Sequence, residues 1–118
     1  RAFGERHRIA PTFVAEGLVD RLPREMETAI YSITQEALEN VARHARASHV
    51  HVALVAGPDT LQLAVDDDGV GFPPELGQNG ITGTGLIAIR ERARALGGTL
   101  SLTSAGGASV RVRLPLRR

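Results

Sequence analysis

The 118-residue sequence predicts a two-layer α+β sandwich, in which a sheet is covered by helices on one face. Two pairs of alternating apolar runs, each joined by a short turn containing glycine, predict antiparallel hairpins at about 48–65 and 100–114. Apolar residues three or four apart predict a long helix at about 23–46 and a second from about residue 84. Because each strand has one apolar face, helices are expected on that face alone.

Composition limits the classes of protein that this chain can represent. Lys plus Arg is 14 and Asp plus Glu is 13, a balance that argues against a nucleic-acid-binding surface. The absence of cysteine excludes disulfides and thiolate metal sites. No apolar run approaches the roughly 20 residues that cross a bilayer.

The length suits one domain with an aliphatic core, since aromatic residues make up only 3% of the chain. We expect residues 9–118 to form this domain and residues 1–8 to be the frayed end of an upstream element. The sequence begins with arginine and not methionine, so it is expected to be a fragment of a longer protein.

The first elements are an edge strand at about 9–15 and the long helix. Pro11 suits an edge strand, because proline has no N–H for a second neighbour. Pro23, followed by Glu25 and Glu27, is typical of the first turn of a helix. The positions that recur along one helix face are Met26, Ile30, Ile33, Ala37, Val41 and Ala45.

The two hairpins and the second helix follow. Residues 57–59, Gly-Pro-Asp, are expected to turn the first hairpin, and residues 105–107, Ala-Gly-Gly, the second. Between the hairpins lie a glycine-rich loop at 72–84 and the second helix, which Gly97 and Gly98 should end as a C-cap. Pro115 is expected to close the sheet.

An acidic turn follows the second strand of the first hairpin. Asp66, Asp67 and Asp68 are consecutive, and Gly69 and Gly71 follow them. Adjacent carboxylates repel one another, so folding alone does not account for them. A carboxylate beside bare glycine backbone suits recognition of a flat polar ligand. A calcium loop is the rival interpretation, but its first ligand position would be Ala64 and Pro73-Pro74 interrupts it.

A polar stripe runs along the long helix. Glu36, Asn40 and His44 are spaced four apart and so share a face, with Arg43 beside them. An amide oxygen and a cation in such a stripe could hold Mg²⁺ and a polyphosphate. Taken alone, the stripe favours a solvated helix face with a Glu36–Arg43 ion pair.

A second glycine motif, Gly83-Thr84-Gly85-Leu86, opens the second helix. Free N–H groups at a helix N-terminus bind phosphate. The order of residues fits neither a dinucleotide fingerprint nor a P-loop. Alone, it is also typical of an ordinary loop before a helix.

Together and in this order, the three motifs resemble those of bacterial sensor histidine kinases. Residues 35–45 (QEALENVARHA) resemble the N box, residues 67–72 (DDGVGF) the first glycine box, and Gly83-Thr84-Gly85-Leu86 the second. The resemblance implies the Bergerat fold of the gyrase–Hsp90–histidine kinase–MutL superfamily, in which a mixed, largely antiparallel sheet is covered by helices on one face. The residues QEALEN and RER (90–92) resemble the subfamily whose response regulators carry helix-turn-helix domains.

The resemblance also implies roles for single residues. Asp67 would accept a hydrogen bond from the adenine amino group, and Gly69 and Gly71 would let the backbone approach the base. Asn40 would bind Mg²⁺. Glu36 would help to take the proton from the phosphoacceptor imidazole. The residues implied to contact the nucleotide elsewhere are Arg43, His44, Gly83, Thr84, Gly85 and Leu86.

One departure from the family pattern lies in the second hairpin. Ala108 stands where a glycine is common before the hydroxyl residue, here Ser109, so the resemblance does not extend to a Ser109–adenine contact.

The implied function is the ATP·Mg-binding catalytic domain of a histidine kinase. Its γ-phosphoryl group would pass to a histidine on an upstream dimerisation domain, in a homodimeric parent protein that serves a response regulator. The resemblance also implies a cytoplasmic domain without membrane contact of its own, whether or not the parent is a membrane protein. Two alternatives are an anti-sigma-factor serine kinase and a degenerate interaction module that no longer binds ATP. The isolated domain is not expected to phosphorylate itself.

Overall fold

Five strands and two α-helices form the computed structural model, which describes residues 10–17, 22–71, 86–104 and 106–116. The strands are β1 (Ala10–Glu16), β2 (His49–Ala56), β3 (Thr60–Asp67), β4 (Thr99–Ser104) and β5 (Ala108–Pro115). The helices are α2 (Arg24–Asn40) and α3 (Leu86–Ala95), and a π-helical turn, η1 (Val41–Ala45), continues α2.

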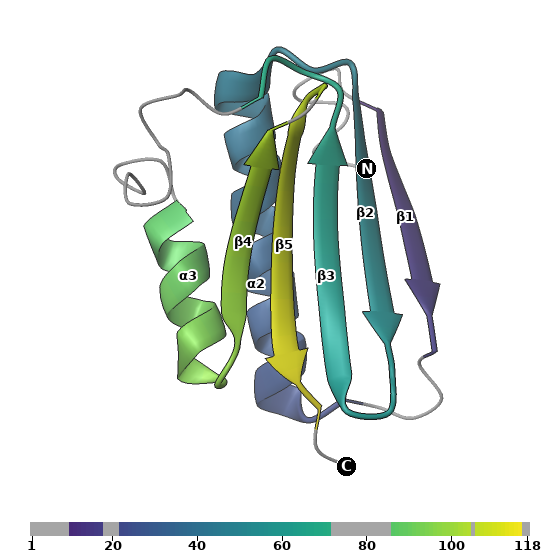
Figure 1. Cartoon of the computed structure of the whole chain (residues 1–118), viewed down its shortest axis with the longest axis vertical. Helices are drawn as coiled ribbons and strands as arrows, with labels where there is room; N and C mark the ends of the chain where they lie inside the picture. The colour runs from purple at the N-terminus through teal and green to yellow at the C-terminus, as the bar shows by residue number, and fades with distance from the viewer. Residues whose placement is uncertain (1–9, 18–21, 72–85, 105, 117–118) are drawn as a thin grey trace.

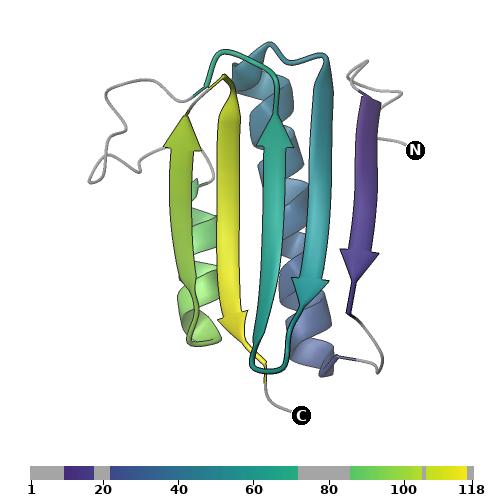
Figure 2. The same ribbon diagram turned by 45° about the vertical axis from the view of Figure 1, so that its right-hand side comes forward.

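The sheet has the order β1-β2-β3-β5-β4. Its two hairpins are antiparallel, as predicted, and β3 pairs with β5 to join them. The edge strand β1 is parallel to β2, so the sheet is mixed. Figures 1 and 2 show α2 and α3 side by side on one face of this sheet, which confirms the predicted two-layer sandwich.

The core lies between the helices and the apolar face of the sheet. In β2, Val50 and Val52 are buried, whereas His49 and His51 are exposed on the other face. The same alternation runs through β3 and β5, as their period of two requires. The side chains that are almost completely buried include Ile33, Leu61, Leu86, Ile89 and Leu114.

The ends of the helices follow local sequence signals. Pro23 precedes α2, and its carbonyl accepts the N–H groups of Met26 and Glu27 at 3.0 Å each. Helix α3 ends as predicted: Gly97 has a φ of +78°, and the Gly98 N–H donates to the Ala93 carbonyl at 2.8 Å. This backbone pattern is a Schellman C-cap, in which glycine takes up the left-handed conformation without strain.

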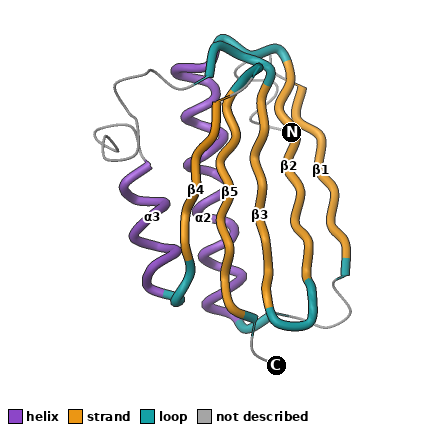
Figure 3. The backbone as a smooth tube through the Cα atoms, in the orientation of Figure 1, coloured by secondary structure: helices purple, strands orange, loops and turns teal. Residues whose placement is uncertain are grey.

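The predicted single helix over 23–46 is wrong at its end, because the α-helical pattern stops at Asn40 (Figure 3). The Val41 N–H is shared between the carbonyls of Ala37 and Leu38, and one wide π turn then leads to Arg46 in a left-handed conformation. Apolar spacing alone does not distinguish a wide turn from a regular one. Such turns occur preferentially at functional sites.

Candidate nucleotide site

The sequence motifs are brought to one end of the sheet. Helix α2 ends there with Asn40, β3 ends with Asp67, and β5 begins with Ala108. In Figure 1 this end is at the top, where β3 and β4 finish and the upper end of α2 lies behind them. The acidic turn and the N-box stripe, which are separated in the sequence, therefore occupy the same end of the fold.

Asp67 is held by backbone donors on one carboxylate oxygen. Its Oδ1 accepts the N–H of Gly69 at 2.8 Å and the N–H of Ala108 at 3.2 Å. Two donors fix the orientation of the carboxylate, and within the described residues its Oδ2 makes no hydrogen bond. Asp67 is only partly buried, so this second oxygen can accept a hydrogen bond from a ligand.

The other two aspartates of the acidic turn point to different partners. Asp66 lies on the face of the sheet opposite the helices, where its Oδ2 is 3.6 Å from Arg111 Nη2. Asp68 Oδ1 accepts the N–H groups of Ser48 and His49 at 2.9 and 3.0 Å. The consecutive carboxylates thus do not share a site, which relieves much of their mutual repulsion.

The hydrogen bonds to Asp68 also change its acidity. The backbone N–H of His49, then that of Ser48 and then the His49 side chain, lower the pKa of the Asp68 carboxyl below its ordinary value of 3.8. Asp68 therefore joins the start of β2 to the end of β3 as an anion, a structural role that sequence reasoning did not assign.

Gly71 has a role inside the protein in addition to the predicted one. Its φ is +81°, and a Cβ there would lie 2.1 Å from Ser104 Oγ. The glycine therefore lets the acidic turn pack closely on the end of β4. Whether its backbone also approaches a base stays a prediction, as it does for Gly69.

Asn40 is the buried polar residue of this end of the fold. It is 9% exposed, and neither Oδ1 nor Nδ2 has a hydrogen-bond partner in the described part of the chain. An unpaired buried amide costs about 1–3 kcal/mol, a cost that a ligand contacting it would offset. Mg²⁺ accepts an amide carbonyl as one of its oxygen ligands, and Asn40 fits that requirement.

The ion pair expected on the helix is present. Arg43 Nη2 lies 3.6 Å from Glu36 Oε2, and Arg43 Nη1 lies 4.0 Å from Glu39 Oε1. The Arg43 side chain is 49% exposed, so these pairs contribute little to stability and its guanidinium is accessible to an anion. His44 lies within η1, and its side chain is outside the described residues.

Helix α3 begins at Leu86, the last residue of the second glycine motif. The Leu86 side chain is 1% exposed and belongs to the core, so a contact with a nucleotide would fall to its backbone. The remaining motif residues, Gly83, Thr84 and Gly85, are outside the described residues.

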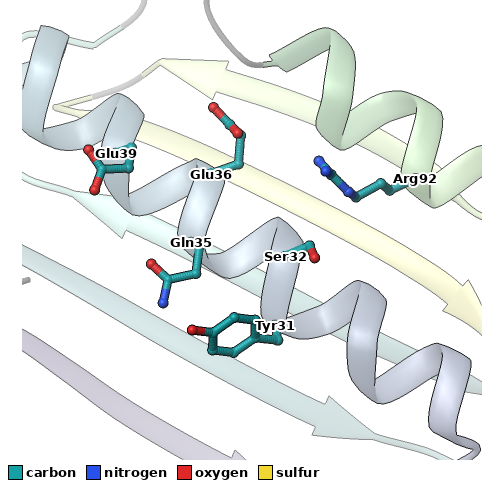
Figure 4. Close-up of a pocket in the computed structure, with 6 residues that line it drawn as sticks. All are labelled: Tyr31, Ser32, Gln35, Glu36, Glu39 and Arg92. Atoms are coloured by element: carbon teal, nitrogen blue, oxygen red, sulfur yellow. The ribbon is translucent and has the colours of Figure 1, made fainter.

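A shallow pocket of ≈ 240 Å³ lies between α2 and α3. Figure 4 shows Glu36 of α2 and Arg92 of α3 projecting toward it from opposite sides. The other lining residues are Tyr31, Ser32, Gln35 and Glu39. The pocket adjoins the N-box stripe through Glu36 but includes neither Asn40 nor Asp67.

Sequence reasoning missed the contribution of the second hairpin. Ala108 was noted only for replacing a common glycine, yet its N–H holds Asp67. Gly107, with a φ of +134°, lets the two segments meet, since a Cβ there would lie 2.0 Å from the Asp67 carbonyl oxygen. The sequence does carry one signal for this contact, the pair Gly106-Gly107, because a hairpin turn by itself does not require two adjacent glycines.

Comparison with known proteins identifies the family. Residues 25–118 match the family described as Histidine kinase-, DNA gyrase B-, and HSP90-like ATPase, and the chain belongs to this family. Within it, the chain is an ATP-binding catalytic domain of the histidine kinase type.

The curated relatives are named as histidine kinases. The chain is 38% identical to the Signal transduction histidine-protein kinase/phosphatase UhpB of Salmonella typhimurium, over 81% of this chain and 19% of the relative. It is 36% identical to the Sensor histidine kinase MctS of Rhizobium johnstonii, over 96% of this chain and 25% of the relative. The chain therefore spans a quarter or less of these two proteins.

Solved structures agree on the fold. A blue-light activated histidine kinase of Erythrobacter litoralis superposes with a TM-score of 0.81 at 26% identity, covering 98% of this chain and 41% of that one. The ATP binding domain of PrrB from Mycobacterium tuberculosis superposes with a TM-score of 0.71 at 24% identity, covering 100% and 90%. Among the described residues, no helix is long and apolar enough to cross a membrane.

Proposed function

We propose that this domain binds ATP with Mg²⁺ and supplies the γ-phosphoryl group to a histidine on a dimerisation domain of the same protein. The observation that carries this proposal is Asn40, whose buried amide has no partner among the described residues and lies at the same end as Asp67. The two residues suit the two ends of one ligand: a metal-bound phosphate and an adenine.

Each residue has a part in this reaction. Asp67 Oδ2 accepts the adenine amino hydrogen, Asn40 Oδ1 would hold Mg²⁺, and Arg43 turns toward the phosphates. When bound, Mg²⁺ neutralises phosphate charge during transfer. Glu36, 3.6 Å from Arg43, helps to remove the proton from the attacking imidazole. We assign the phosphate end of the site to Gly83, Thr84, Gly85 and the backbone of Leu86, and a further nucleotide contact to His44.

The protein around the domain follows from the same proposal. We propose a homodimeric cytoplasmic kinase portion whose phosphohistidine serves a response regulator. The curated relatives described above are named as histidine kinases, and neither a serine kinase nor a module without ATP has a comparable observation in its favour.

Two measurements test the proposal. A fluorescent ATP analogue should bind the domain more tightly with Mg²⁺ than with EDTA, and failure to bind would overturn the proposal. With γ-labelled ATP, the domain alone should stay unlabelled, and addition of the protein's histidine-containing domain should give acid-labile label. Acid-stable label would indicate a serine kinase instead.

A further inference from the structure

The Asp67 carboxylate takes its orientation from a segment far along the chain. Its Oδ1 accepts one N–H from Gly69, two residues away, and one from Ala108, 41 residues away. A carboxylate oxygen has two lone-pair sites, and these two donors occupy both of them. Any amino group of a ligand must therefore approach Oδ2, in the direction that the Ala108 N–H helps to set.

The contact requires a glycine at residue 107. Gly107 is buried, and a Cβ built there would lie 2.0 Å from the Asp67 carbonyl oxygen and 2.9 Å from its carbonyl carbon. Backbone atoms cannot move aside as a flexible side chain does. A side chain at 107 would therefore separate the start of β5 from the end of β3 and take the Ala108 N–H away from Asp67.

The neighbouring glycine has no such constraint, although its backbone is also left-handed. Gly106 has a φ of +70°, and a Cβ there would meet nothing within 4 Å. An alanine at 106 therefore carries the conformational cost of a positive φ without the collision. Gly106→Ala therefore controls for a positive φ in this turn, whereas Gly107→Ala, at a φ of +134°, adds the collision with the Asp67 backbone.

We infer that Gly107 and Ala108 are positioning residues that set the selectivity of the site for a purine with a 6-amino group. A carboxylate fixed on one oxygen presents the other as a rigid acceptor, so little ordering is required when the amino group binds. A carboxylate released from Ala108 can rotate, and its hydrogen bond to the amino group then weakens. The rest of the nucleotide keeps its contacts, because they involve other residues.

The inference rests on the proposed function and predicts a selective change. The probes are ATP and purine riboside triphosphate, which differs from ATP in lacking the 6-amino group. A hydrogen bond to a charged group contributes about 1.5–3 kcal/mol, so the wild-type domain should prefer ATP by about tenfold to a hundredfold. Gly107→Ala should reduce this preference to a few-fold, while its affinity for the analogue stays within about threefold of the wild-type value. Gly106→Ala should keep the wild-type preference for ATP.

The outcomes are distinct. If Gly107→Ala loses affinity for ATP and for the analogue by the same factor, the inference is wrong. It is also wrong if the two alanine variants have the same preference for ATP. Either result leaves the proposed function standing. Failure of the wild-type domain to bind ATP would overturn the proposed function itself.

A measurement that does not depend on the folding of Gly107→Ala tests the contact directly. In Asp67→Ala, the amide hydrogens of Gly69 and Ala108 should exchange with solvent faster than in the wild type. The Gly57 amide, which donates to the Thr60 carbonyl at 2.8 Å in the β2–β3 turn, is the control and should not change. An unchanged Ala108 amide would contradict the inference.

Discussion

Asp68 and His49 contact each other in three ways across the β2–β3 hairpin. The His49 N–H donates to Asp68 Oδ1 at 3.0 Å, His49 Nδ1 lies 3.2 Å from Oδ2, and the Asp68 N–H donates to the His49 carbonyl at 3.3 Å. The start of β2 and the end of β3 are thus joined immediately beside Asp67. The carboxylate form of Asp68 is the one that these donors favour.

This contact predicts how stability depends on pH. Because the pKa of Asp68 is lower in the folded than in the unfolded chain, its contribution is complete above its ordinary pKa of 3.8 and is lost as pH falls through the folded value. Asp68→Asn should therefore lose less stability than the wild type on acidification from about pH 5 downward. Urea unfolding at several pH values measures this, with Asp59→Asn in the β2–β3 turn as control. Identical profiles for wild type and Asp68→Asn would contradict it.

Asp67 and Asp66 should differ in their effect on nucleotide binding. Asp67→Asn puts an amide where a rigid acceptor is needed, so ATP affinity should fall about tenfold to a hundredfold. Asp66→Asn, on the opposite face beside Arg111, should change it less than about threefold. Calorimetric titration of both variants measures the difference. Equal losses would show that the wrong carboxylate has been assigned to adenine.

Asn40 should contribute to ligand binding and not to the stability of the empty fold. Leucine has a similar shape and needs no partner, so Asn40→Leu should melt at or above the wild-type temperature without nucleotide. It should also lose the additional stabilisation that Mg²⁺ gives to the ATP complex. Asn40→Asp keeps an oxygen ligand and is the control that retains this effect. A drop of several degrees in empty Asn40→Leu would show that the amide has a structural partner.

Glu36 should affect phosphoryl transfer more than ATP binding. General-base assistance contributes about 10²–10⁴ in rate, so Glu36→Gln should slow labelling of the histidine-containing domain by an amount in that range. Its affinity for ATP should remain within a few-fold of wild type. Glu39→Gln, which alters the other carboxylate beside Arg43, is the matched control. Equal rates for Glu36→Gln and wild type would remove Glu36 from the chemistry.

A prediction about the hydrophobic core compares a buried and an exposed residue of α2. Ile33 is 0% exposed and Tyr31 is 65% exposed. Ile33→Ala leaves a cavity against the sheet and should cost about 2–5 kcal/mol of unfolding free energy. Tyr31→Ala should cost less than about 1 kcal/mol. Chemical denaturation measures both, and similar losses would mean that α2 does not pack as described.

Much of the fold could be predicted because it depends on local periodicity. The strands through Val50, Val52, Leu61 and Leu63 alternate with a period of two, and the face of α2 through Met26 and Ile33 recurs at helical spacing. The π turn could not be predicted in this way, because one extra residue in a single turn leaves the apolar pattern around Val41 unchanged. The parallel direction of β1 also has no local signal.

The candidate site could be predicted only where a motif is continuous in sequence. The acidic turn and the N box were recognised from adjacent residues, and the structure brings Asp67 and Asn40 to one end of the sheet. The donor from Ala108 was missed because a backbone N–H has no side-chain signature. The distinct partners of Asp66 and Asp68 depend on strand register, which places His51 opposite Asp66 and Val50 opposite Asp67.

The parallel edge strand has a consequence for the order of folding. Thr12 and His51 form a side-chain contact across 39 residues, and closure of this loop must enclose the whole of α2. The β3–β5 pairing also closes a long loop, because its paired residues are 43 to 55 apart in the sequence, whereas the β2–β3 and β4–β5 hairpins close short loops at a smaller loss of chain entropy. The two hairpins can therefore form early, whereas the β1–β2 and β3–β5 pairings each wait for a long loop to close. Once β1 is in place, it covers the N–H and C=O groups along one side of β2, and the edges of the finished sheet are β1, which carries Pro11, and β4.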